Sequence, residues 1–516
     1  MNKMRLRFAP SPTGALHIGG VRTALYNYLL CKKHDGDFIL RIEDTDRFRF
    51  VPGAEEYILR SLSWCGIEPD EGPKTGGDYG PYRQSERSKI YRQYADELVK
   101  KGKAYYAFDT QEELDARREE ERKKGNQLFK YDHRHRADMK NSLTLDREEV
   151  EDRLGSGEEY TIRLKVPAGQ TVVFEDEVRG EVAFETDELD DKVLLKADGL
   201  PTYHLANVVD DHLMEITHVV RGEEWLPSTA HHVLLYRALG WHAEMPKFAH
   251  LPLILKPNGK GKLSKRDGKK LGIPVFPLNW EGEGETETFV GFREFGFLPE
   301  AVVNFLALLG WNPGTEQEIF SMDELVEAFS IDKIGKSGAR FDFDKAKWFN
   351  QQYLIASDDA RLAGLVRPII ENQGHQPEED FLKTFCGLMK ERVSLLMEFW
   401  ESGYYFFEPV RNYDEKNISK RWKPERLPAF EELRVRLSEI EDYSAGRIKA
   451  ETESLMQAYD LKYGDVLPIL RLAMAGTMKG PAIFEMMELL GKEEVDRRLE
   501  RAYELFANIA EKGQSS

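Results

Sequence analysis

Residues 8–20, which read FAPSPTGALHIGG, constrain the chain more than any other stretch. Residues 4–9 (MRLRFA) predict a buried opening strand, Pro10 to Gly14 a turn, and Gly19 to Lys33 a helix. A strand, a tight turn and a helix in succession form an anion site, because the free amides and positive end of the helix attract phosphate. The sequence therefore predicts an α/β sheet with a phosphate site after its first strand.

Three residues of this segment are candidates for the phosphate contact. Gly19 and Gly20 let a phosphate approach the backbone, and the imidazole of His17 can donate a hydrogen bond to it. The alternative is that His17 is a helix-capping surface histidine, since single histidines at loop ends are common.

A second glycine-rich stretch lies far downstream. Residues 259–268 read GKGKLSKRDG and place basic side chains, Lys262 and Lys265 among them, between glycines. We expect a mobile cationic loop that closes over the negative charge developing on pyrophosphate. On its own the stretch would be read as a solvated basic loop. Together with residues 8–20, it predicts a two-sided clamp for the triphosphate of ATP.

The same residues resemble two known signatures. Residues 17–20 (HIGG) are similar to the HIGH signature, and residues 262–266 (KLSKR) to the KMSKS signature, of class I aminoacyl-tRNA synthetases. Four further runs resemble the glutamyl and glutaminyl branch: 41–47 (RIEDTDR), 201–206 (PTYHLA), 208–211 (VVDD) and 221–225 (RGEEW). Because the likeness extends through the C-terminal third, the chain resembles the bacterial glutamyl-tRNA synthetases.

The resemblance implies a fold class and a domain order. We expect a Rossmann-like α/β catalytic domain with a parallel sheet and an α+β insertion, followed by an all-α anticodon-binding region. The expected boundaries are 1–108 and 191–268 for the two catalytic halves, 109–190 for the acceptor-binding insertion, 269–335 for a stem-contact or linker region, and 336–516 for the anticodon-binding helices.

The hydrophobic pattern agrees with this order. Residues 191–197 and 218–221 read as strands that return the chain to the nucleotide sheet, and residues 279–288 as an exposed loop or hairpin. Amphipathic spacing predicts helices after residue 336, for example over 381–399. In an open parallel sheet the ligand binds at the carboxyl ends of the strands, where Ala9, Glu43 and Arg221 should converge.

A pocket for glutamate must hold one ammonium and two carboxylates. That requires a carboxylate partner and at least one arginine. Arg7 and Arg221, on strands expected to be neighbours, can supply guanidinium groups, and Glu43 an acceptor for the ammonium. The alternatives are that Arg7 is a strand-end charge and Tyr203 a core ring. By the resemblance, the amino-acid pocket consists of Arg7, Ala9, Ser11, Glu43, Tyr203 and Arg221.

The resemblance also assigns the nucleotide end of the site. It implies catalytic roles for His17, Gly19, Gly20, Lys262 and Lys265, and ATP binding by Ser11, His17, Gly19, Gly20, Glu224, Ser264 and Lys265. The implied activity is that of a glutamate–tRNA ligase: glutamate attacks the α-phosphate of ATP, pyrophosphate leaves, and the 3′ end of tRNA(Glu) takes the glutamyl group. Catalysis then rests on positioning and charge stabilisation, with Mg²⁺ on the phosphates.

Other functions are compatible with parts of the chain. A ligase that makes a free adenylate without RNA, or a catalytically silent RNA-binding relative, would share the fold, and a tRNA-modifying paralogue would share the catalytic half. His17 and Lys265, together with the long helical tail, favour the tRNA ligase. Whether tRNA(Gln) is also charged, and which residues read the anticodon, stays open. We expect a monomer.

Cysteine usage bears on metals and compartment. Only Cys31, Cys65 and Cys386 occur among 516 residues, which suggests neither a disulfide framework nor a thiol metal cage. Many bacterial relatives carry a zinc-binding Cys-x-Cys pair where residues 106–109 read YAFD, so we predict no structural zinc and place His133 and His135 on the RNA-facing surface. No apolar run approaches the roughly 18 residues of a membrane span, and we expect a cytoplasmic protein.

The net charge of −18 argues against a nucleic-acid partner only if the negative charge is evenly spread over the protein. Residues 117–136 contain a dense basic run interrupted by glutamates. Such a run is more often a solvated helix face than a binding site, although the resemblance places it in the insertion that meets the tRNA acceptor end.

Overall fold

The computed structural model describes residues 3–126, 129–282 and 288–514, with side chains up to residue 511. The chain forms two compact units. The larger comprises Met1–Glu294 with Val302–Phe343, and the smaller comprises Phe295–Ala301 with Asp344–Ser516.

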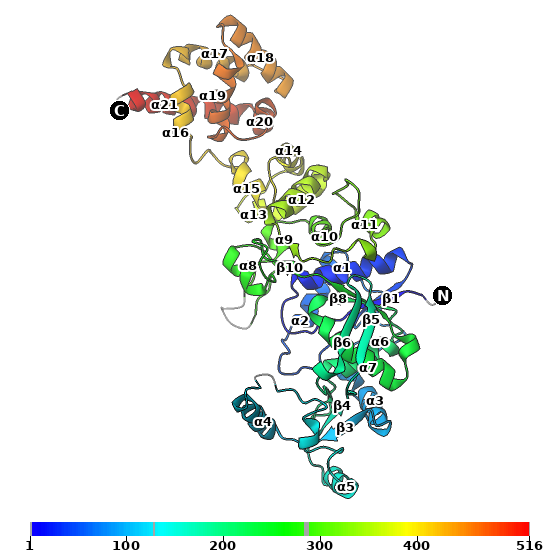
Figure 1. Cartoon of the computed structure of the whole chain (residues 1–516). Coiled ribbons are helices and arrows are strands. Elements are labelled where there is room, and N and C mark those ends of the chain that lie inside the picture. Colours follow the sequence, from blue (N-terminus) through cyan, green and yellow to red (C-terminus); the bar gives the residue numbers. More distant parts are fainter. Residues whose placement is uncertain (1–2, 127–128, 283–287, 515–516) are drawn as a thin grey trace. The chain divides into compact units, whose positions relative to one another are not determined.

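The larger unit is built around a six-stranded sheet (Figure 1). Its strands stand in the order β2 (Asp37–Leu40), β1 (Arg5–Phe8), β8 (His218–Gly222), β9 (Lys247–Leu251), β5 (Thr171–Asp176) and β6 (Gly180–Glu185). Neighbouring strands run parallel except β5 and β6, which form an antiparallel pair at one edge. The predicted parallel α/β sheet is therefore confirmed, and β1 and β8, which carry Arg7 and Arg221, are neighbours in it.

Helices connect and cover the strands. The first, α1 (Ile18–Lys33), packs against β1, β2 and β8 and buries Val21, Leu25 and Leu29 at helical spacing. The other elements of this unit are α2 (Ala54–Trp64), α3 (Ser88–Lys100), α4 (Gln111–Lys123), α5 (Arg147–Gly155), α6 (Tyr203–Leu213), α7 (Leu226–Leu239), β10 (Ile254–Leu255), α8 (Lys265–Leu271), α9 (Phe292–Phe295), α10 (Pro299–Ala307), α11 (Met322–Ala328) and β11 (Ala339–Arg340), with α9 and α10 each running across a unit boundary.

A second, three-stranded sheet corrects one prediction. The strand expected at residues 191–197 exists as β7 (Val193–Leu195), but it pairs antiparallel with β4 (Thr161–Leu164), which also pairs with β3 (Ala104–Ala107). It does not return the chain to the nucleotide sheet; β5 and β6 join that sheet instead. Periodicity locates a strand but not its partner, because pairing is decided by long-range packing and register.

The basic run of residues 117–136 begins on the exposed helix α4. Its cations pair with acids about one turn away: Arg118 with Asp115 at 2.5 Å and Arg122 with Glu119 at 3.2 Å. Such i,i+3 pairs are those of a solvated helix face. The prediction that this run meets RNA is not tested by this arrangement.

The smaller unit is helical. Its helices are α12 (Phe343–Ala356), α13 (Asp359–Glu371), α14 (Glu379–Met389), α15 (Glu398–Gly403), α16 (Glu415–Arg421), α17 (Leu427–Ser438), α18 (Ala445–Ala458), α19 (Tyr463–Ala475), α20 (Ile483–Leu490) and α21 (Lys492–Gln514), with α12 starting one residue before the unit. They enclose a core that includes Phe385, Trp422 and Leu470. The predicted all-α C-terminal region is confirmed.

One predicted helix of this unit, over residues 381–399, is wrong in extent. It is broken between Met389 and Glu398, where a new helix, α15, begins, and within the break the Ser394 amide N–H donates to the Glu398 carboxylate at 2.6 Å.

Residues Phe295–Ala301 belong to the core of the smaller unit although they precede it in the chain. Leu298 and Ala301 are 1% exposed within that core. The Asn350 side chain accepts the Leu298 amide at 2.7 Å and donates to the Gly296 and Ser394 carbonyls at 3.3 and 2.6 Å. This segment is therefore held by hydrogen bonds as well as by apolar packing.

The segment expected as a loop or hairpin at 279–288 is described only at its ends. Trp280 and Phe289 exchange backbone hydrogen bonds of 3.0 and 2.9 Å, as in a hairpin, while residues 283–287 lie outside the described residues. Among the described helices, none is both long enough and apolar enough to cross a membrane.

Candidate active site

A cavity of about 970 Å³ opens at the carboxyl ends of β1, β2 and β8. This is the edge of a parallel sheet where ligands are expected. Every site residue predicted from the sequence lines it: Arg7, Ala9, Ser11, His17, Gly19, Gly20, Glu43, Tyr203, Arg221, Glu224, Lys262, Ser264 and Lys265.

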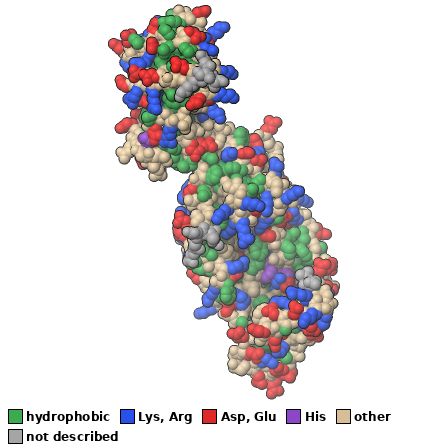
Figure 2. All heavy atoms as spheres, turned by 90° about the vertical axis from the view of Figure 1, so that its left-hand side faces the viewer, with side chains coloured by type: hydrophobic (Ala, Val, Ile, Leu, Met, Phe, Trp, Pro, Cys, Tyr) green, Lys and Arg blue, Asp and Glu red, His purple; other side chains and the backbone are tan. Residues whose placement is uncertain are grey.

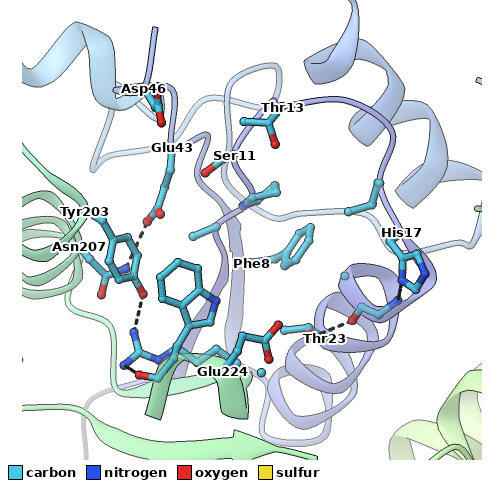
Figure 3. A pocket seen from close by; sticks show the side chains of 18 of the residues that line it. Phe8, Ser11, Thr13, His17, Thr23, Glu43, Asp46, Tyr203, Asn207 and Glu224 are labelled. Atoms are coloured by element: carbon cyan, nitrogen blue, oxygen red, sulfur yellow. Dashed lines mark hydrogen bonds between the residues drawn. The ribbon is translucent and has the colours of Figure 1, made fainter. Parts of the chain in front are cut away.

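The cavity has two chemically different ends (Figure 3). Glu43, Tyr203 and Asn207 lie on one side, and His17 and Thr23 lie on the other. The first side is built from the segment after β2 and from α6, and the second from the start of α1. Glu43 and Tyr203 were predicted to bind the amino acid and His17 the phosphates, and these roles stay predictions.

His17 caps helix α1 and also faces the cavity. Its Nδ1 accepts the amide N–H of Gly19 at 3.1 Å, so the capping alternative describes its geometry correctly. Its buried Nε2 has no hydrogen-bond partner among the described residues. Burial, reinforced by the charges of Lys265 and Lys262, lowers the pKa of His17 to about 3. The ring is therefore neutral. Because Nδ1 accepts a hydrogen bond, the proton is on Nε2, which can donate to a ligand in the cavity.

The second basic stretch is only partly a loop. Lys265–Leu271 form helix α8, and its N-cap Ser264 exchanges hydrogen bonds with Asp267 in a capping box. The expectation of a loop through Gly268 is thus wrong for its second half. The cap also holds the pKa of Asp267 at about 2, through hydrogen bonds from Ser264 and then Lys256.

The two signature segments meet at Lys265. A Cβ built on Gly14, whose φ is +121°, would lie 3.4 Å from Lys265 Nζ. The ammonium also lies 5.8 Å from the centre of the Phe276 ring, whose edge-on neighbour is His17. Lys262 pairs with Glu224 at 2.7 Å. The cavity therefore presents two lysines and one imidazole donor at one end.

A buried ionic network supports the end of the cavity that carries Glu43. Arg7 donates to both carboxylate oxygens of Asp211, at 3.0 and 3.2 Å, and Arg41 donates to the same group at 2.8 Å. Glu43 accepts from Arg41 and Asn207, each at 3.2 Å. Burial alone would raise the pKa of Asp211, but the two guanidinium groups hold it below its usual range, whereas burial raises the pKa of Glu43.

Arg221 stands at the end of β8, buried beside the cavity. It donates to the Tyr203 hydroxyl at 2.6 Å, the Thr229 hydroxyl at 2.8 Å and His250 Nε2 at 3.1 Å. Longer contacts reach His232 Nδ1 at 3.5 Å and the Trp225 carbonyl at 3.4 Å. All these partners are neutral. Burial lowers the pKa of the Arg221 guanidinium. Asp211 and Glu43 act on it only through their charge, so a carboxylate entering the cavity could be its first directly bonded anionic partner among the described residues.

Sequence reasoning missed several residues of the site. Asn207 lies one helical turn after Tyr203 on α6, and this i,i+4 spacing could have predicted a shared face. His250 and Asp176, which stand behind Arg221, carry no local signal because they come from β9 and β5, far apart in the sequence.

The mouth of the cavity carries an exposed aromatic ring. Phe48 is 99% exposed and lines the cavity together with Asp46 and Arg49. The Asp46 carboxylate accepts the amide N–H groups of Phe48 and Arg49, at 3.2 and 3.3 Å, which orders the backbone of this turn. Figure 2 shows Lys and Arg side chains beside Asp and Glu side chains on the visible face of the molecule.

The described residues hold no cluster of three or more His, Cys, Asp or Glu side chains arranged for a metal. In residues 106–109, Asp109 accepts from the Tyr131 hydroxyl at 2.9 Å and from the Lys140 amide at 3.0 Å. His135 Nδ1 lies 2.9 Å from Asp132. The prediction of no structural zinc stays a prediction.

Comparison with known proteins supplies the family. Residues 3–348 match the family model of tRNA synthetases class I (E and Q), catalytic domain, and residues 361–503 match that of the anticodon binding domain. A glutamate–tRNA ligase of Phocaeicola vulgatus is 53% identical over 98% of this chain and 99% of its own length. The chain belongs to the glutamate–tRNA ligase family. Another ligase of the family, from Flavobacterium psychrophilum, is 54% identical over 97% of the chain and 99% of its own length.

A solved structure of this ligase family has the same fold. The crystal structure of a glutamate tRNA ligase from Elizabethkingia meningosepticum, in complex with its amino acid, matches with a TM-score of 0.93 and 49% identity. The match covers 98% of this chain and 99% of that one. Enzymes of this ligase family use ATP, which agrees with a cavity that has a cationic end.

Proposed function

We propose that this chain activates L-glutamate with ATP and transfers the glutamyl group to the 3′ end of tRNA(Glu). The observation that carries the proposal is the pairing, in one cavity, of a buried arginine with neutral partners and a cluster of two lysines and an imidazole donor. The first suits the carboxylate of an amino-acid side chain, and the second suits a triphosphate.

In the first step, the α-carboxylate oxygen of glutamate attacks the α-phosphorus of ATP. The bond from that phosphorus to the bridging oxygen breaks, and pyrophosphate leaves. We assign His17, the Gly19 and Gly20 backbone, Lys262 and Lys265 to the charge that develops on the phosphates, with Ser11, Glu224 and Ser264 beside them. Mg²⁺ bound to the phosphates would neutralise part of the same charge.

In the second step, the 3′-terminal ribose hydroxyl of the tRNA attacks the activated carbonyl carbon, and AMP leaves. No side chain forms a covalent bond, so the chain contributes position and electrostatics. We assign Arg7, Ala9, Ser11, Glu43, Tyr203 and Arg221 to the glutamate. Glu43, already an acceptor for two N–H donors, supplies negative charge for the ammonium.

The exposed Phe48 supports an RNA partner at the cavity mouth. Aromatic side chains serve as platforms on which unpaired bases stack, with contributions from arginines, and Arg47 and Arg49 are the sequence neighbours of Phe48. The 3′ end of a tRNA is unpaired and must reach the glutamyl group inside the cavity. We therefore propose that Phe48 stacks against a terminal base.

Several expectations remain proposals beside this one. We propose the five-part order given above, with β5 and β6 counted with the main sheet that they join, an insertion without zinc, a monomer and a cytoplasmic location. The acceptor-binding and anticodon-binding assignments follow the family, and the match of residues 361–503 to an anticodon binding domain supports the second.

Pyrophosphate exchange into ATP tests the proposal. Exchange should require glutamate and tRNA(Glu) together, should fail with glutamine, and should collapse in Lys265→Ala. The exposed Lys269→Ala, on the same helix, is the matched control. Exchange without tRNA would indicate a free-adenylate ligase, and no exchange under any condition would indicate a catalytically silent RNA-binding protein.

A further inference from the structure

Three side chains form a hydrogen-bonded row behind the glutamate end of the cavity. Asp176 Oδ2 lies 2.6 Å from His250 Nδ1, and His250 Nε2 accepts the Nε–H of Arg221 at 3.1 Å. Asp176 and His250 have fully buried side chains, and Arg221 is 5% exposed. We propose that His250, oriented by Asp176, positions Arg221 for the side-chain carboxylate of glutamate. The proposal rests on the proposed function.

The row follows from strand register. Arg221 on β8 and His250 on β9 are directly paired residues of two parallel strands. Asp176 ends β5, the next strand, and is paired with Phe248 of β9. Side chains at matched positions of adjacent strands stand on the same face of a sheet. The sheet itself therefore fixes the order Asp176, His250, Arg221.

The hydrogen bonds specify where the His250 proton lies. Because Nε2 accepts from Arg221, it cannot carry a proton, and the proton must be on Nδ1, facing Asp176. Burial lowers the pKa of His250, so the ring is neutral. Burial alone would raise the pKa of Asp176, but the hydrogen bond from His250 lowers it. Asp176 thus selects the tautomer that Arg221 requires.

Asp176 is itself immobilised by the backbone. Its Oδ1 accepts the amide N–H groups of Val178 and Arg179 at 3.0 and 2.8 Å. The His250 amide donates to the same oxygen at 3.3 Å. The row is therefore anchored at its far end.

The positioning has a consequence for selectivity. With Nε held by His250, one edge of the Arg221 guanidinium is fixed, and Nη1 and Nη2 face Tyr203 and Thr229. A fixed guanidinium whose partners are neutral favours a carboxylate over the uncharged amide of glutamine. A guanidinium free to rotate would lose part of this preference.

Two substitutions of His250 separate positioning from packing. In His250→Gln, the side-chain oxygen reaches the place of Nε2 and can still accept from Arg221. In His250→Asn, the shorter amide can reach Asp176 but leaves Arg221 Nε without an acceptor. Steady-state charging of tRNA(Glu) gives the KM for glutamate, ATP and tRNA separately, and charging with glutamine gives the selectivity.

We expect His250→Asn to raise the KM for glutamate about ten- to hundredfold, the usual loss for a hydrogen bond to a charged group, and to lower the preference for glutamate over glutamine. His250→Gln should stay much closer to the unsubstituted protein, and the KM for ATP and tRNA should not change in either. Equal effects of the two variants, or a parallel rise in the KM for ATP, would overturn the proposal.

A second variant covers the case in which His250→Asn does not fold. Asp176→Asn keeps a hydrogen-bond acceptor for His250 without the charge, and it should raise the KM for glutamate while leaving that for ATP unchanged. An unchanged KM for glutamate would refute the role of Asp176. If the unsubstituted chain charges no tRNA with glutamate, that result contradicts the proposed function rather than the positioning role of His250.

Discussion

His17 serves two purposes with its two ring nitrogens. Nδ1 caps α1, and Nε2 faces the cavity without a partner among the described residues. The two roles can be separated, because asparagine is an equally good N-cap but does not place an N–H where Nε2 lies.

His17→Asn should therefore leave the thermal midpoint nearly unchanged and lower kcat about 10²- to 10³-fold, the usual effect of losing one donor to a developing charge. His17→Ala should lower both quantities. Melting curves and single-turnover charging give the two values, and a kcat near normal in His17→Asn would remove His17 from catalysis.

Phe48 gives a second prediction for a single residue. Phe48→Ala should raise the KM for tRNA(Glu) about five- to hundredfold, the usual contribution of one stacked base, while the KM values for ATP and glutamate stay the same. Phe48→Trp should retain the contact. Val290→Ala, which also removes an exposed apolar side chain but outside the cavity lining, is the matched control.

Binding measurements with tRNA lacking its three terminal nucleotides complete this test. The truncated tRNA should bind Phe48→Ala and the unsubstituted protein equally well. A persisting difference would mean that Phe48 acts elsewhere than at the 3′ end.

The residues that the sequence predicted for the site all line one cavity, but their partners were not predictable. His17, Lys265 and Arg221 belong to short local signatures, and the structure brings all of them to one cavity. The row behind Arg221 joins three strands that are separated in the sequence. Such contacts depend on register, which no local pattern contains.

Among the elements, helix α8 shows what the local sequence pattern can predict and what it cannot. The glycines around residue 260 indicated a loop, whereas residues 264–267 (SKRD) carry a capping-box pattern that predicts a helix start. The cap places Lys265 in the first turn of α8. Its ammonium position therefore depends on the helix as well as on the loop before it.

Asp267 allows this dependence to be measured, because it closes the capping box but does not line the cavity. Asp267→Ala removes a contact that contributes about 1 kcal/mol to a helix start. The KM for ATP should rise about fivefold with an unchanged KM for glutamate. An unchanged KM for ATP in Asp267→Ala, or an equal rise in the Lys269→Ala variant, would show that α8 does not position Lys265.

At the scale of the whole molecule, buried histidines make stability depend on pH. Burial, followed by electrostatic interactions with His231, Lys192 and Arg221, lowers the pKa of His204 to about 3. Above pH 6.5 the ring is neutral in both the folded and the unfolded chain. Between pH 6.5 and 3 only the unfolded chain binds the proton, so the free energy of unfolding falls as the pH falls.

The slope should reach about 1.4 kcal/mol per pH unit for each such histidine. His204→Gln should therefore lose less stability than the unsubstituted protein between pH 7 and about pH 5, measured as the urea midpoint. His34→Gln, at an exposed site, is the control. Parallel pH profiles for all three proteins would contradict the neutral state of His204 in the folded protein.

The two compact units were predictable as an α/β part and a helical part, because the change from mixed to purely helical periodicity is visible in the sequence. The position of Phe295–Ala301 was not, since seven residues carry too little pattern to show which core they join. Only packing against the core of the smaller unit, together with the hydrogen bonds to Asn350, decides this.

That segment affects how the protein should respond to limited proteolysis. Cleavage of the peptide bond after Phe343 cuts the chain where it enters the smaller unit for the second time. The fragment ending at Phe343 would still have Leu298 and Ala301 buried in the core of the other fragment. A nicked molecule should therefore migrate as one species under native conditions and separate into two only when it is denatured.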